Sequence, residues 1–450
     1  MIERIFGISK QGSTFGREVL GGVVTFMTMA YIISVQPALM SVHAPSWVQF
    51  GDSTFFSIMV ATCLVSAFAT LVMAFGANYP IALAPGMGIN VLFAMIIGRV
   101  ANTPEKALGV IFIAGLIFLL ISLFRIRERI ITLISASLKS SIAVAIGLFI
   151  LLLGALNAFV NPLAGHNPPA GFDLLRWEFN FAFDLSVFLV FVINLAIIGI
   201  LYLLRVPGCL LFGMLAGSVV ATLFGVLNVS GMVAPVPSLA PTLLQVDILG
   251  ALSLTLIPYI IIFLFIDVFD TMGTLVGVAQ KAKLTRPDGS LPRAKGALMA
   301  DAVGTMAGSL CGVSTVTSYI ESSAGVASGA RTGLASVVTA VFFLAALFFT
   351  PLWAGLSAGF IVGPVLIAVG LIMMTETRKI AWREWTEAVP AALTIVVMVA
   401  LQSIHHGLAA GFISYPVCKL LAGRLREISW LNWVMAAVSV GMVVLVYLTV

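Results

Sequence analysis

Two aspartates stand three residues apart in an otherwise apolar stretch, FLFIDVFDTMGTLVG, at residues 263–277. On a helix, four polar residues of this stretch fall at i, i+3, i+4 and i+7 and form one stripe: Asp267, Asp270, Thr271 and Thr274. A charge at the centre of a bilayer costs about 2.5–3.5 kcal/mol on insertion scales, and two carboxylates this close resist joint ionisation. The stripe is therefore expected to face the protein interior, where an acid can carry a proton or belong to a structural hydrogen-bond network.

Two glycines on the same stretch, Gly273 and Gly277, are four residues apart. Small residues at this spacing allow a neighbouring helix to approach closely in a membrane. We expect a packed helix crossing there.

Two short segments broken by small residues carry further polar groups: ANYPIALAPGMGINVLFA, with Asn90, and CGVSTVTSYIESSAGVASG, with Glu321. Pro80 and Pro85 exclude a continuous helix in the first, so its residues before Gly86 are expected to be extended. Gly86 and Gly88 then open a half-helix whose first amides have no partner within it. A pair of such segments at corresponding positions indicates a transporter's binding site; the alternative is glycine-mediated helix packing.

Other polar residues are open to two interpretations. Asp301 lies near the start of an apolar span, where helix capping or pairing with a basic loop explains it as well as transport chemistry does. Four more residues are candidates to line the site: Thr25, Thr28, Thr271 and Ser322. For Thr25 and Thr28 of the first span, ordinary interior packing is an equally good explanation. The four cysteines form no CxxC pair, and neither a metal site nor a cofactor is expected.

The composition restricts which elements can hold these residues. Of 450 residues, 61% are hydrophobic and 9% are charged, whereas a soluble domain has roughly 25% charged residues. Apolar runs of about 20 residues recur along the chain, which predicts an all-α polytopic membrane protein. No removable signal peptide is expected, and the net charge of +5 does not suggest nucleic-acid binding.

We place seven spans in the first half, at 18–39, 55–76, 80–98, 106–124, 130–154, 186–204 and 208–227. Seven more follow at 251–274, 297–312, 317–328, 332–355, 359–375, 387–402 and 404–422, while 430–449 is either an extra span or a surface helix. An odd number of spans per half inverts the second half. The layout predicts repeats at 1–227 and 251–422, an extracytoplasmic connection at 228–250 and a C-terminal apolar segment at 423–450.

The distribution of basic residues predicts the orientation. Most lie in connections on one side of this layout: Arg125, Arg127, Arg129, Arg205, Lys281, Lys283, Arg286, Arg293, Lys295, Arg331, Arg378, Lys379 and Arg383. The connection 228–250 has neither lysine nor arginine, whereas Arg99, Lys106 and Arg176 are exceptions on the outer side. The positive-inside rule then makes the N-terminus cytoplasmic.

Acids together with an amide suit a solute that presents donors and acceptors side by side. A carboxylate accepts two parallel N–H bonds, and an asparagine amide both donates and accepts. The flat edge of a nucleobase matches this set, but amino acids, polyols and other amides match it equally well. Composition and spacing therefore indicate a proton-linked small-solute transporter.

Four motifs extend this interpretation: GGVVTFMTMAYIISVQP, LAPGMGIN, DVFDTMGTLVGVAQKA and SYIESSAGVASGARTGLASVV. With them, nearly the whole chain resembles the AzgA-like purine permeases of the nucleobase–cation symporter-2 superfamily. The resemblance implies fourteen transmembrane segments in two inverted seven-segment repeats, divided into a core and a gate domain. It also implies a short strand plus a half-helix in segments 3 and 10, with the substrate between them and segment 8.

Carried over by motif, Asn90, Asp267 and Glu321 would bind substrate near Gly86 and Gly88, and Asp267, Asp270 or Glu321 would carry the proton. Family members often differ at Gly86 and Val91, and some have asparagine at Asp267. The choice of proton carrier therefore stays open.

The resulting hypothesis is a multi-pass proton symporter of the cell inner membrane that imports hypoxanthine, guanine or adenine. The alternatives are a uracil or xanthine transporter of the same superfamily and an anion transporter of the same fold that uses Arg331. An intramembrane enzyme would need a nucleophile–base pair or metal ligands, which the sequence does not show. The expected partners are the base, the proton and the lipid bilayer; a homodimer is left open.

Overall fold

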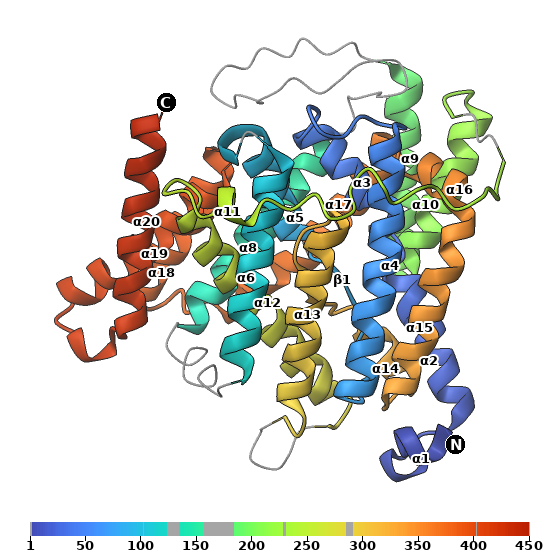
Figure 1. Ribbon diagram of the computed structural model, residues 1–450, viewed down its shortest axis with the longest axis horizontal. Helices are drawn as coiled ribbons and strands as arrows, with labels where there is room; N and C mark the ends of the chain where they lie inside the picture. The colour runs from blue at the N-terminus through green and yellow to red at the C-terminus, as the bar shows by residue number, and fades with distance from the viewer. Residues whose placement is uncertain are drawn as a thin grey trace.

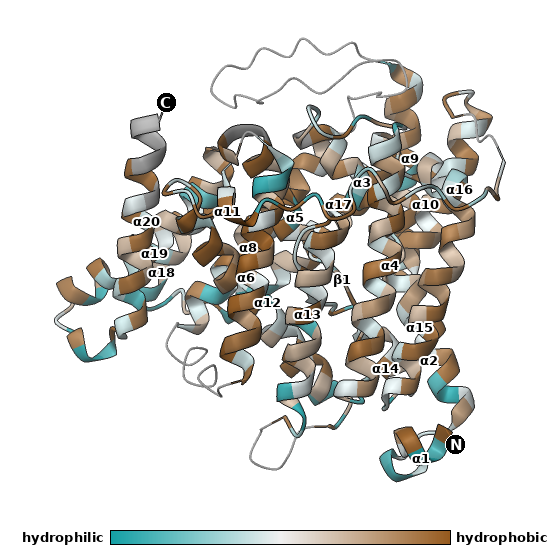
Figure 2. Cartoon of the chain, viewed as in Figure 1, coloured by the Kyte–Doolittle hydropathy of each residue, from teal (hydrophilic) through white to brown (hydrophobic). Residues whose placement is uncertain are grey.

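The computed structural model describes residues 2–101, 103–123, 135–156, 184–227, 231–284, 291–401 and 403–449. Within these ranges, eight helices are long and apolar enough to cross a membrane. Figure 1 shows most helices standing upright, with the N-terminus at the bottom and the C-terminus at the top. In Figure 2 hydrophobic colour covers α4, α6 and α15, whereas hydrophilic colour gathers at α1 and at the turn before α20. This is the pattern of a bundle that crosses a membrane.

The first half contains α1 (Ile2–Phe6), α2 (Phe15–Met29), α3 (Ile32–His43), α4 (Ser53–Gly76), β1 (Leu83–Pro85), α5 (Met87–Ile96), α6 (Pro104–Leu123), α8 (Ala136–Leu156), α9 (Leu185–Leu203) and α10 (Cys209–Leu223). The predicted first span is thus divided into α2 and α3. The predicted break of the third span is confirmed, because β1 precedes the half-helix α5. Arg125, Arg127, Arg129 and Arg176 lie outside the described residues.

The second half contains α11 (Ile248–Ala251), α12 (Ile257–Lys281), α13 (Ala294–Cys311), β2 (Val316–Ser318), α14 (Ser322–Ala327), α15 (Gly333–Ala346), α16 (Thr350–Leu356), α17 (Gly359–Met374), α18 (Trp385–Ala400), α19 (Ile404–Leu421) and α20 (Trp430–Thr449). The eighth span begins at Ile257 rather than at 251. Asp247 caps the separate short helix α11, and Pro258 favours a new helix start. Arg286 lies outside the described residues.

Packing between the halves is reciprocal, as the inverted repeat predicts. Helix α6 packs on α13, and α15 packs on α4; α18 packs on α8, and α17 packs on α9. Corresponding elements also meet each other, in the pairs α4–α13, α8–α17 and β1–β2. The chain therefore has the fold of two inverted seven-segment repeats.

These contacts divide the helices into two groups. The core group contains α2–α6 and α12–α16, and the gate group contains α8–α10 and α17–α19. Helix α20 belongs to neither repeat and contacts both groups, through α19 and α12. The apolar run at 430–449, left open by the sequence, is a helix packed along the bundle (Figure 1).

The strands β1 and β2 meet inside the core group and pair antiparallel, with Ala84 opposite Thr317. Backbone bonds extend the pairing, from Gly86 N to Thr315 O and from Tyr319 N to Ala82 O, both 3.0 Å. Side chains accept from two further backbone amides of this segment: Ala82 N donates to Ser322 Oγ and Leu83 N donates to Thr70 Oγ1. Irregular backbone at membrane depth is tolerated here because protein groups satisfy it.

The half-helix α14 is fixed in place by α2 and by the loop that follows it. A Cβ on Gly325 would lie 2.4 Å from the carbonyl oxygen of Gly21, so only glycine permits this crossing. Beyond α14, the fully buried Glu18 carboxylate accepts from the amides of Arg331 (2.9 Å) and Thr332 (3.2 Å). Together these contacts set the position of Glu321 relative to α2.

Candidate functional site

Asn90 lies on the first turn of α5 and is completely buried. Its side-chain oxygen accepts a short hydrogen bond from Ser314 Oγ, just before β2. Its Nδ2 has no hydrogen-bond partner among the described residues. An amide donor at the start of a half-helix is thus left available.

Asp267 lies on α12, which contacts both α5 and β2. Its Oδ2 accepts from Thr305 Oγ1 of α13 (3.1 Å), and the side chain is 1% exposed. Its Oδ1 has no hydrogen-bond partner in the described part of the chain. An unpaired buried acceptor is costly, so Asp267 and Asn90 together offer one acceptor and one donor to a ligand.

Asp301 is fully buried on α13 and interacts electrostatically with Asp267. Thr271 Oγ1 donates to it (2.5 Å), as does Ser318 Oγ of β2 (3.4 Å). The sequence left two other roles open for Asp301, helix capping and pairing with a basic loop. The described contacts of Asp301 show neither. Asp301 instead lies in the same buried network as the predicted site acid.

Asp270 departs from the polar stripe expected on α12. Thr271 and Thr274 are buried with Asp267, whereas Asp270 is exposed to solvent. Its carboxylate nevertheless interacts with Asp301 and with Glu321, and it lies beside Thr317 of β2. The expectation of an interior stripe holds for three of the four residues.

The expected helix crossing at Gly273 and Gly277 is wrong. A Cβ added to either glycine would meet no atom of the described ranges within 4 Å. The face of α12 that carries these glycines is therefore open, and close helix packing does not explain them.

Glu321 immediately precedes α14 and receives a hydrogen bond of 2.7 Å from the Tyr31 hydroxyl. Thr28 Oγ1 approaches its backbone carbonyl (3.4 Å). The first amides of α14 already donate to the carbonyls of Tyr319, Ile320 and Glu321. Of the two half-helices, only α5 can therefore offer amides at its start.

The remaining predicted residues have structural contacts of their own. A Cβ on Gly88 would lie 2.5 Å from Ile146 of α8, and one on Gly86 would lie 3.1 Å from Thr317. Thr25 lies at the crossing with Gly325, and Ser322 holds the amide of Ala82. Their roles toward a ligand stay predictions.

The sequence interpretation missed several hydroxyl donors and one amide. Thr305 and Ser314 hold Asp267 and Asn90, yet serine and threonine are common in spans and carry no local signal. Gln36 of α3 is fully buried, and neither polar atom of its side chain has a partner among the described residues. A glutamine inside an apolar span is a signal that could have marked it.

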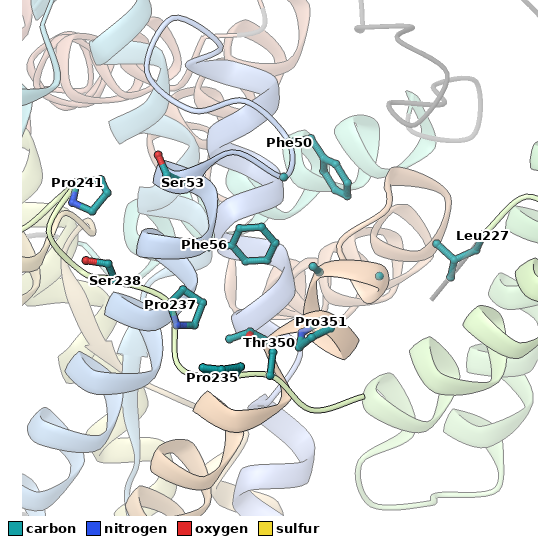
Figure 3. Close-up of a pocket in the computed structure, with 14 residues that line it drawn as sticks. Phe50, Ser53, Phe56, Leu227, Pro235, Pro237, Ser238, Pro241, Thr350 and Pro351 are labelled. Carbon is teal, nitrogen blue, oxygen red and sulfur yellow. The ribbon is translucent and has the colours of Figure 1, made fainter. Parts of the chain in front are cut away.

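A cavity of about 470 Å³ lies away from these acids, near the end of the bundle opposite the N-terminus. Figure 3 shows Phe56 and the prolines 235, 237 and 351 around it, from α4, the connection after α10 and α16. Its lining contains no charged side chain. The cavity therefore cannot supply the acid chemistry of the candidate site.

Within the described ranges, no group of three or more His, Cys, Asp or Glu residues is placed to hold a metal ion. The acids of the candidate site are instead surrounded by hydroxyl and amide groups, which suit an uncharged, hydrogen-bonding solute.

Known proteins similar to this chain are permeases. The family model described as "Permease family" matches residues 16–406. The adenine permease AdeP of Escherichia coli is 37% identical, covering 95% of this chain and 93% of its own length. The guanine/hypoxanthine permease PbuG of Bacillus subtilis is also 37% identical, covering 95% of this chain and 96% of its own length. The predicted resemblance to purine permeases is confirmed.

The fold also matches a solved structure, the transmembrane domain of the cyanobacterial bicarbonate transporter BicA. The TM-score is 0.65 at 15% identity, over 87% of this chain and 96% of that domain. At this identity the likeness supports the inverted-repeat fold alone. The permease family and the permease relatives agree with the expectation of a transporter rather than an enzyme.

Proposed function

Because the chain belongs to the permease family, we propose that it imports purine nucleobases such as adenine, guanine or hypoxanthine. One observation carries the proposal: Asn90 Nδ2 and Asp267 Oδ1 are buried without partners among the residues that the structure describes, on elements that pack together. A purine base has ring N–H donors and adjacent acceptors on one flat edge. Asp267 would accept an N–H of the base, while Asn90 and the first amides of α5 would donate to its acceptors.

We further propose that a proton accompanies the base. Asp270 interacts with each of Asp267, Asp301 and Glu321, and Asp267 interacts with Asp301, so adding a proton reduces their repulsion. One proton moved down about 100 mV supplies about 2.3 kcal/mol. Since 1.4 kcal/mol corresponds to tenfold, this supports roughly a fifty-fold gradient of the base.

The proposed cycle moves the core group against the gate group. The site elements β1, α5, α12, β2 and α14 all belong to the core group, so the base would move with them. We place the protein in the inner membrane with a cytoplasmic N-terminus, because basic residues lie beside the N-terminal segment. Arg293 donates to the carbonyl of Ala77, next to Asn78, which donates to Phe6 of α1, and the Arg331 amide donates to Glu18 of α2.

The anion alternative finds no support at Arg331. Its guanidinium donates to the carbonyls of Val326 and Ala330 at the end of α14. The guanidinium is therefore bonded to backbone carbonyls of its own segment, whereas acids dominate the candidate site.

The site assignment is tested by uptake of labelled bases in a host that lacks purine uptake. Asp267→Asn, Asn90→Ala and Glu321→Gln should each reduce accumulation at least tenfold at wild-type membrane levels. Asp184→Asn is the matched control, because within the described ranges Asp184 caps α9, away from the site, and asparagine caps equally well. Wild-type uptake by all three site variants would overturn the assignment.

Competition and uncoupling test the substrate and the driving ion. Unlabelled adenine, guanine, hypoxanthine, xanthine and uracil should separate purine import from the alternatives of the same superfamily. A protonophore should abolish accumulation. Sodium-dependent uptake that ignores the protonophore would reject proton coupling.

A further inference from the structure

Asp270 has an unusual environment for a residue in the middle of a transmembrane helix. It lies eleven residues before the end of α12, yet it is exposed to solvent. Groups from α13, β2 and the start of α14 surround it, namely Asp301, Thr317 and Glu321. A carboxylate that is crowded by polar protein groups and still accessible lies at the bottom of a crevice and not against lipid.

The crevice continues along one face of α12. Gly273 and Gly277 stand at i+3 and i+7 from Asp270, so the three residues share that face. In the part of the chain that the structure describes, no atom lies within 4 Å of a Cβ added at either glycine. Toward the helix end, Gln280 and Lys281 are exposed as well. The open face thus runs from Asp270 to the last turn of the helix.

The far end of this face meets α14. Lys281 Nζ donates to Ser323 Oγ of α14 at 3.4 Å, on the side of the bundle where the N-terminus lies (Figure 1). Ile320, between β2 and α14, is 50% exposed although it stands beside Glu321. The gap is therefore bounded by α12 on one side and by the β2–α14 segment on the other.

We propose that the Asp270–Gly273–Gly277 face of α12 is the wall of an aqueous passage that joins the candidate site to the N-terminal side of the membrane. The two glycines keep the passage wide enough for a flat heterocycle, and Lys281 and Ser323 stand at its mouth. The identity of the solute, a purine base, rests on the proposed function, whereas the passage itself does not.

Thiol accessibility tests the passage. Gly273→Cys and Gly277→Cys are exposed to a charged, membrane-impermeant methanethiosulfonate from each side of the membrane, and labelling of the wild-type cysteines is subtracted. Leu275→Cys is the buried control on the same helix. Phe68→Cys is the lipid control, because Phe68 is 46% exposed on α4 and, like Gly273, lies eight residues before the end of its helix. Such reagents need an ionised thiol, which hydrocarbon does not allow.

We expect both glycine positions to react at least tenfold faster than either control, from the N-terminal side. Equal reaction at Gly273→Cys and Phe68→Cys would show that this face contacts lipid and would overturn the proposal. Gly273→Leu, at normal protein level, should lower the rate of base uptake at least tenfold. Normal transport by Gly273→Leu would also contradict the passage.

Substrate protection separates the two proposals. Saturating adenine, guanine or hypoxanthine should slow labelling at Gly273→Cys at least threefold. Fast labelling from the N-terminal side without protection by any base, and without uptake of any base, would reject purine transport while the passage stands.

Discussion

The contact between Gly21 and Gly325 gives a sharp test of how α14 is positioned. In Gly325→Ala the new methyl group would lie 2.1 Å from Thr25 Oγ1 and 2.4 Å from the carbonyl oxygen of Gly21. Thr25 can change rotamer, but the carbonyl oxygen is part of the α2 backbone. Since ordinary contact begins near 3.4 Å, α14 must move away from α2 by about 1 Å.

The displacement should act on the site more than on the fold. It moves Glu321 away from the Tyr31 hydroxyl, which is now 2.7 Å away, and a bond lengthened by about 1 Å is no longer a hydrogen bond. Overpacking of this kind costs about 1–3 kcal/mol. At 1.4 kcal/mol per tenfold, this predicts purine binding weakened by roughly five-fold to 150-fold if the strain falls on the bound state.

The assay is purine binding to the purified protein by calorimetry, together with initial uptake rates at matched membrane levels. Gly16→Ala is the control, because it makes the same substitution on α2 where no atom lies within 4 Å of the added Cβ. Gly325→Ala with wild-type affinity and uptake would refute the reasoning that the glycine crossing sets the position of Glu321.

Three further predictions concern single contacts. Tyr31→Phe removes the hydroxyl that donates to Glu321 and should lower uptake by roughly tenfold to 150-fold, since a hydrogen bond to a charged group contributes about 1.5–3 kcal/mol; an unchanged pH profile of uptake would contradict a role in holding that acid. Glu18→Gln exchanges a buried carboxylate that caps two amides, so the melting temperature in detergent should fall by several degrees; an unchanged melting temperature would show that the charge is dispensable. The hydrogen bond from Thr386 lowers the pKa of Glu384 below its ordinary 4.5; Lys419 and Arg424 add to this effect, and partial desolvation opposes it. The Glu384 carboxylate therefore stabilises the fold above pH 4.5, and this stabilisation is lost as the pH falls through the lower pKa of the folded state. The difference in melting temperature between wild type and Glu384→Gln should shrink below pH 4.5, and a constant difference would contradict this.

The sequence was sufficient for the features that depend on local chemistry. Two prolines and two glycines within 80–88 are incompatible with a continuous helix, and the structure has β1 and the start of α5 there. An acid inside an apolar run needs polar protein groups around it. This requirement predicted that Asp267 and Glu321 lie next to other polar groups, as they do. Boundaries of most spans also agreed, because length and hydropathy determine them.

Features that depend on distant contacts could not be predicted. Leu83 and Ser318 are partners in one ladder, but three-residue strands more than 200 positions apart carry no pairing signal. The glycine pair 273 and 277 has the spacing of a packing motif, and only the structure shows that nothing packs there. Conversely, Gly325 has the same four-residue spacing to Gly329, and it does make a close crossing, with Gly21 of α2, so the spacing alone does not tell a packed glycine from an open one.

The partners of the site acids bear on which solute the protein can move. Thr305 holds Asp267, Thr271 and Ser318 hold Asp301, and Tyr31 holds Glu321. In the described part of the chain the ion pairs lie elsewhere, at Lys379, Lys419 and Arg424. A lysine or arginine partner would keep a carboxylate ionised, because neutralising it would leave a buried cation unpaired. A hydroxyl can donate to a carboxylate and can also accept from a carboxylic acid. The side-chain partners of these acids are hydroxyls, so the acids can gain and lose a proton while those contacts are kept, which is what the proposed coupling of a proton to a neutral base requires.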